Sequence, residues 1–216
     1  MSPNSAVLPQ GLRSPSQFVR RYPVTCVYGT VVAATATVAW ISPRTNERLY
    51  DYLSTNLDNL ADHPLRALFG SGLLVDGQLL PNLVMALGPM ALSEARIGSV
   101  ATAGIFVAGH VGASLLTART IRRGLAQEYY PSSVRSDRDV GVSYGSLTIR
   151  FALIGEVRPG WPRAVATGSA AAWLVATQPW RLPRDFTSTG HVIAAGLGLV
   201  FAGVIATRRR GSGSLP

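Results

Sequence analysis

A few polar side chains lie within otherwise apolar stretches, and these residues could do chemistry: Gln78, Asn82, His110, Ser143, Arg150 and His191. Polar and ionisable groups are costly at membrane depth, so each is a functional candidate. A serine hydroxyl becomes a nucleophile when a neutral imidazole takes its proton, and nearby donors can then stabilise the oxyanion. These residue types therefore predict acyl transfer, with Ser143 as the nucleophile and a histidine as the base.

Two amide side chains are candidates for binding the oxyanion. Gln78 and Asn82 are four residues apart, which places them on one helical face, and both carry amide donors. Pro81 between them is tolerated because it falls in the first turn of a helix.

Small residues around Ser143 offer a second interpretation of this stretch. Gly141 and Gly145 form a small-xxx-small pair, and Ala194 and Gly198 repeat the spacing on a later apolar stretch. Such pairs let membrane helices approach closely, so Ser143 could be a packing residue. The same close approach would bring together residues 48 positions apart in the sequence.

The elements that must position these residues are apolar. Only 14% of residues are charged, against roughly 25% in soluble domains, and 47% are hydrophobic. Six apolar stretches follow one another: 24–41, 79–93, 97–118, about 140–155, 161–178 and 189–207. The first is long enough to span a bilayer. We therefore predict an all-α polytopic membrane protein whose domain, 23–207, is a bundle of six transmembrane helices.

The connection 42–78 is the longest between these stretches. Leu49, Leu53, Leu57 and Leu60 recur at spacings of four, four and three, which places them on one helical face. This pattern predicts an amphipathic helix, lying either in the membrane interface or packed on the bundle.

Amino-acid composition also indicates which classes of partner and cofactor to expect. All 20 basic residues are arginines, and the formal net charge is +9. Many arginines flank apolar stretches, so membrane lipids with anionic headgroups are expected partners rather than nucleic acid. The single cysteine, Cys26, excludes an internal disulfide, and no cysteine pattern suits a metal. We expect no metal and no cofactor.

Arginine placement predicts the orientation. The segment 1–22 carries Arg13, Arg20 and Arg21, and the segment 208–216 opens with three arginines. Both tails are therefore expected in the cytoplasm, polar and disordered, with an even number of spans between them. The loop between the third and fourth apolar stretches weakens this prediction. It carries five arginines between positions 119 and 138, which favour the cytoplasm, whereas six spans with a cytoplasmic N-terminus place this loop outside. We expect an integral protein of a bacterial plasma membrane.

Five short motifs occur in a characteristic order: "HPLR" (63–66), "QLLPN" (78–82), "SEARIG" (93–98), "GVSY" (141–144) and "GHVIAAGLG" (190–198). In this order and spacing, roughly residues 24–207 resemble the rhomboid intramembrane serine proteases. The family has a serine in a G-x-S-x motif at the head of a short fourth helix, and a histidine that begins the sixth helix.

The resemblance implies a role for each matching residue. Ser143 is the nucleophile and His191 the base, while Asn82, Gln78 and a backbone N–H bind the oxyanion. The substrate is a transmembrane segment of another protein, and no metal or cofactor takes part. His110 matches no catalytic position, so we expect it to form an interhelical hydrogen bond.

Three positions depart from the family pattern. Gln78 replaces a histidine, Leu65 replaces a tryptophan, and Leu147 stands where a tyrosine commonly packs on the catalytic histidine. The departures favour a second hypothesis, a rhomboid-like pseudoprotease that binds transmembrane clients or a membrane complex without cleaving them. A solute transporter is a remote third, because no inverted repeat is visible. Substrate identity, partner proteins and oligomeric state are not assigned.

Overall fold

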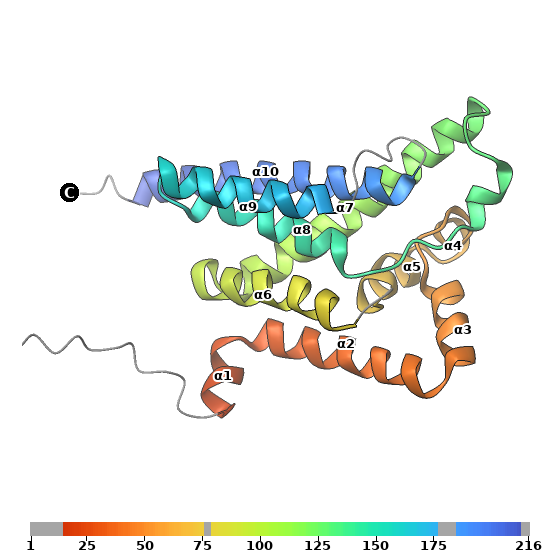
Figure 1. Cartoon of the computed structure of the whole chain (residues 1–216), viewed down its shortest axis with the longest axis horizontal. Helices are drawn as coiled ribbons and strands as arrows, with labels where there is room; N and C mark the ends of the chain where they lie inside the picture. Colours follow the sequence, from red (N-terminus) through yellow and green to blue (C-terminus); the bar gives the residue numbers. More distant parts are fainter. Residues whose placement is uncertain (1–14, 76–78, 177–184, 213–216) are drawn as a thin grey trace, which may run out of the picture.

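The computed structural model describes residues 15–75, 79–176 and 185–212, and all regular secondary structure in these ranges is helical (Figure 1). The α-helices are α1 (Pro15–Arg21), α2 (Pro23–Ile41), α3 (Pro43–Leu53), α4 (Leu57–Asp62), α5 (Pro64–Gly70), α6 (Leu79–Ile97), α7 (Ser99–Ala126), α8 (Ser143–Ala152), α9 (Trp161–Ala176) and α10 (Phe186–Ser212). Short 3-10 helices are η1 (Ser71–Leu73), η2 (Ser132–Ser136) and η3 (Leu153–Glu156). The all-α prediction is confirmed.

Three of these helices are long and apolar enough to cross a membrane. They are α2, α7 and the part of α10 from Phe186 to Arg209. The helices α6, α8 and α9 coincide with the other predicted stretches, but α8 has 10 residues. At 1.5 Å per residue, α8 covers about 15 Å, half of a bilayer core. The chain is thus a helical membrane protein, and six spans remain a prediction.

The short helix α8 lies at the centre of the bundle, in contact with α6, α7, α9 and α10 (Figure 1). Its residues Tyr144 to Ile149 are all buried, which is why an apolar helix can be this short and still be held. A Cβ on Gly145 would lie 2.5 Å from the Phe106 ring of α7. Close approach of α7 to α8 therefore requires glycine at this position.

The connection after α2 is not one amphipathic helix, so that prediction is wrong. The helix α3 ends at Leu53 and α4 begins at Leu57, where the Asn56 side chain accepts a hydrogen bond from the Asn59 amide at 2.8 Å. This N-cap starts a new helix in a new direction. Leu57 and Leu60 pack against the α7 side chains Ala118 and Ile121, so this part of the connection lies on the bundle.

The disorder expected for the two tails is contradicted where the structure describes them. Residues 15–21 form α1, and α10 continues to Ser212. Arg209 in this last part of α10 forms an ion pair with Glu156 and donates a hydrogen bond to the Glu156 carbonyl, which holds the end of the helix against η3. Residues 1–14 and 213–216 lie outside the described ranges.

The glutamate of the "SEARIG" motif joins α2 to the corner between α6 and α7. The Glu94 carboxylate accepts hydrogen bonds from the amides of Val24 and Thr25 at 2.9 and 3.0 Å, and from Ser99 Oγ at 2.7 Å. A carboxylate at the N-terminus of α2 satisfies amides that the helix itself leaves unpaired. Gly98, at φ +84°, makes the turn between α6 and α7.

Candidate active site

A serine and a histidine meet where α8 and α10 begin. Ser143 is the first residue of α8, and His191 lies in the second turn of α10. His191 Nε2 is 2.9 Å from Ser143 Oγ, and both residues are partly buried. This separation is within the range in which an imidazole can take a hydroxyl proton.

Close packing of α8 on α10 produces this separation. The Thr148 hydroxyl donates to the Ala194 carbonyl at 3.1 Å, and Ala194 is fully buried. A Cβ on Gly198 would lie 2.6 Å from the Thr148 carbonyl oxygen, and a Cβ on Gly190 would collide with the Tyr144 phenol. Small residues along α10 therefore set the distance between the two helices.

Gly141 has a different role from the helix packing that its spacing predicts. It lies before α8 begins, with φ +136°, a region that other residues rarely adopt. The Gly141 amide donates a hydrogen bond to the Ser71 carbonyl at 3.0 Å, which connects the segment before α8 to η1. Gly141 thus sets the direction from which the chain enters α8 and presents Ser143.

An aromatic ring contacts the histidine, and it comes from an unexpected position. The Tyr144 and His191 rings have centroids 5.4 Å apart and an interplanar angle of 78°, an edge-to-face contact. The expectation that Leu147 leaves the histidine without an aromatic neighbour is therefore wrong. Leu147 is fully buried in the contact between α8 and α10. The sequence signal was present, since an aromatic residue directly follows the serine.

A buried carboxylate holds the tyrosine. The Tyr144 hydroxyl donates to the two Asp139 carboxylate oxygens at 3.1 and 3.2 Å, and the Thr55 hydroxyl donates to the same carboxylate at 3.2 Å. Asp139 is only 6% exposed. Burial raises the pKa of Asp139 to about 6, although these two hydrogen bonds act in the opposite direction.

The backbone fixes Asp139 in turn. The Thr55 amide donates to the Asp139 carbonyl at 2.9 Å, and the Asp139 amide donates to Ser54 Oγ at 2.8 Å. The break between α3 and α4 therefore supplies the partners of Asp139. A chain of contacts runs from this break through Asp139 and Tyr144 to His191, and sequence reasoning did not find it.

Candidate oxyanion donors lie on two elements. The first backbone hydrogen bond of α8 runs from the Ser146 amide to the Val142 carbonyl. Three amides at the start of the helix come before this bond: those of Ser143, Tyr144 and Gly145. Such amides, at the positive end of the helix dipole, suit a developing negative charge. Asn82 is partly buried in the first turn of α6. Gln78 lies outside the described residues.

The two remaining polar candidates have structural partners. His110 Nε2 lies 3.0 Å from Ser71 Oγ, so this buried histidine joins α7 to η1 as expected. The Arg150 guanidinium lies 4.6 Å from the centre of the Trp173 ring of α9. The Glu156 carboxylate pairs with Arg209. Within the described ranges, no cluster of three or more His, Cys, Asp or Glu side chains could hold a metal.

The fold and the site define a class: a helical membrane protein in which a serine opens a short central helix and a histidine follows near the start of the last helix. The family model described as rhomboid-like protein matches residues 17–211. The chain therefore belongs to the rhomboid-like protein family. Comparisons with curated proteins and with solved structures found no match.

Proposed function

We propose that the protein is an intramembrane serine protease that cleaves transmembrane segments of other proteins with the pair Ser143 and His191. The 2.9 Å separation between His191 Nε2 and Ser143 Oγ is the observation that carries this proposal. Membership of the rhomboid-like family fits the proposal without deciding between cleavage and binding alone.

The mechanism follows from the arrangement of donors. Ser143 Oγ attacks the scissile carbonyl while its proton passes to His191 Nε2. Amides at the start of α8, with Asn82 and Gln78, bind the oxyanion. His191 then returns the proton to the leaving amine as the C–N bond breaks, and a water molecule, activated by the same imidazole, hydrolyses the acyl-enzyme.

In a serine–histidine–aspartate triad the aspartate orients the histidine, and in this proposal Tyr144 takes that role. Among the described residues, His191 Nδ1 has no hydrogen-bond partner, so no carboxylate fixes the ring directly. The edge of the Tyr144 ring limits rotation of the imidazole instead, and Asp139 limits movement of Tyr144. Tyr144 is therefore proposed as a positioning residue.

The proposed arrangement in the bilayer keeps six spans and both termini in the cytoplasm, with residues 23–207 as the membrane domain. The arginines at both ends of the chain support it, because such residues are retained on the cytoplasmic side. Ser143 at the start of α8 would then lie toward the opposite side of the membrane.

A pseudoprotease that binds transmembrane clients is the second candidate. Leu65, at the position where the family has a tryptophan, is 70% exposed, so the loop lacks an aromatic anchor here. Binding without cleavage would leave Ser143 and His191 as packing residues.

Cleavage of a model transmembrane substrate in proteoliposomes separates the two candidates. Ser143→Ala should abolish cleavage while the substrate still binds. Ser146→Ala is the matched control, because the Ser146 hydroxyl lies on the same helix and, among the described residues, donates to the Val142 carbonyl at 2.6 Å. Undiminished cleavage by the Ser143→Ala variant would reject the protease, and client capture by a native protein that never cleaves would favour the second candidate.

A further inference from the structure

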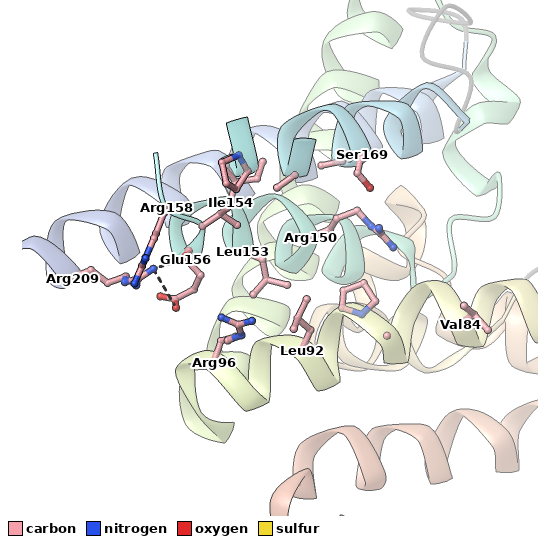
Figure 2. Close-up of a pocket in the computed structure, with 16 residues that line it drawn as sticks. Val84, Leu92, Arg96, Arg150, Leu153, Ile154, Glu156, Arg158, Ser169 and Arg209 are labelled. Carbon is pink, nitrogen blue, oxygen red and sulfur yellow. Dashed lines mark hydrogen bonds and ion pairs between the residues drawn. The ribbon is translucent and has the colours of Figure 1, made fainter. Parts of the chain in front are cut away.

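A cavity of about 770 Å³ opens between α6, α8, η3 and α9, and Figure 2 shows its lining. Neither Ser143 nor His191 lines it. Much of its wall is apolar: Val84, Leu92, Leu153, Ile154, Val157 and Ala166. An apolar wall of this kind, in a membrane protein, suits a hydrocarbon chain.

One end of this cavity is strongly cationic. Figure 2 shows Arg96, Arg158 and Arg209 gathered around Glu156. Glu156 compensates one guanidinium, since its carboxylate lies 3.8 Å from Arg209 Nη1. Arginine stays charged at any physiological pH, so the cluster keeps a net positive charge. Arg150 extends away from this cluster and does not belong to it (Figure 2).

A second cavity, of about 730 Å³, meets the same cluster. It lies between the α6–α7 corner and α10, and Glu156 and Arg209 line both cavities. Its other walls include Ile97, Ile105, Phe201 and Ile205. Two apolar cavities that share one cationic rim match a ligand with two hydrocarbon chains and one anionic group.

We propose that this site binds an anionic glycerophospholipid, with its phosphate between Arg96, Arg158 and Arg209 and one acyl chain in each cavity. Guanidinium groups match phosphate oxygens in charge and in bidentate geometry. A free phosphate would use the arginines alone and leave both apolar cavities unfilled, so a lipid fits the site better. The bound lipid connects α6, η3 and α10, and it does so whether or not the protein is a protease.

Native mass spectrometry of the delipidated full-length protein tests the proposal, by titration with phosphatidylglycerol and with phosphatidylcholine of the same acyl chains. Phosphatidylglycerol should bind at least about tenfold more tightly. The double variant Arg96→Gln/Arg158→Gln should lose about thirtyfold in affinity for it, because each arginine near an anionic headgroup contributes about one factor of five. The matched control is Arg122→Gln/Arg123→Gln, which removes two exposed arginines at the end of α7 and should bind as the native protein does.

A third variant tests the apolar part of the site without changing its charge. Leu92 lines the first cavity and is 49% exposed, so Leu92→Trp should fill the cavity, leave the fold intact and weaken binding of phosphatidylglycerol. Inorganic phosphate at equal concentration should not displace the lipid. Equal affinity for the two lipids, native affinity in both the arginine and the tryptophan variants, or displacement by inorganic phosphate would each overturn the proposal.

Discussion

The contact between Tyr144 and His191 can be tested with two substitutions that differ only in the ring. Tyr144→Phe and Tyr144→Leu both remove the hydroxyl that bonds to Asp139, but only phenylalanine keeps an aromatic edge against the imidazole. Comparing these two variants with each other therefore isolates the ring. Comparing Tyr144→Phe with the native protein isolates the hydroxyl.

The geometry sets the expected magnitudes. A centroid separation of 5.4 Å lies within the range of favourable aromatic pairs, which contribute about 0.5–1.5 kcal/mol beyond burial. If this energy orients the base, its loss slows acylation of Ser143 about two- to tenfold, at about 1.4 kcal/mol per tenfold. Removing the hydroxyl should lower the free energy of unfolding by about 1.5–3 kcal/mol, because its acceptor Asp139 is buried.

The assay is the initial rate of labelling by a fluorophosphonate probe in proteoliposomes, which requires no knowledge of the substrate. We expect Tyr144→Phe to be labelled about two- to tenfold faster than Tyr144→Leu. Unfolding in mild detergent, followed by circular dichroism, provides the stability of each variant. Equal labelling of two folded variants would refute the argument that the tyrosine ring orients His191.

Three further predictions concern the surroundings of the site. The pKa of Asp139 is raised to about 6 by burial, so the stability that this group contributes is full below the ordinary pKa of an aspartate, about 4, and is lost as pH rises through about 6. Asparagine does not titrate, so as pH rises through this range the free energy of unfolding of Asp139→Asn should increase by about 3 kcal/mol relative to that of the native protein. Denaturant titration of both proteins at each pH measures this difference. Family resemblance alone would expect Leu147→Tyr to improve catalysis. Because Leu147 has no exposed surface, this substitution should instead destabilise the protein by about 1–3 kcal/mol and should not raise the rate of labelling. A labelling rate above the native rate would contradict this. Reporter fusions after residue 216 and at residue 60 should place the former in the cytoplasm and the latter outside, and a reversed pair would reject the orientation.

The helical architecture could be predicted from sequence because apolar stretches and small-residue spacing are local signals. The pairing of Ser143 with His191, 48 residues away, came from motif order, and the structure places these two residues together. Burial of Ala194 and the close approach at Gly198 follow from the same four-residue spacing.

Other features depend on contacts between distant segments, and local patterns do not reveal them. Nothing near Asp139 in the sequence indicates that Ser54 and Thr55 surround it, because a helix break far along the chain brings them there. The periodic leucines suggested one helix, but the Asn56 cap and the packing of Leu57 on α7 outweigh that periodicity. Family resemblance predicts an aromatic ring on His191 from the residue one turn after the serine, whereas Tyr144, the residue directly after the serine, supplies it.

The most direct test of a working Ser143–His191 pair is to map the probe's covalent adduct by peptide mass spectrometry. We predict an adduct on Ser143 in the native protein, an unchanged adduct in Ser146→Ala, and none in His191→Ala, because the serine is a poor nucleophile without its base. A native protein that stays unlabelled while a folded rhomboid protease is labelled in parallel, or an adduct that persists on Ser143 without His191, would contradict the proposed mechanism.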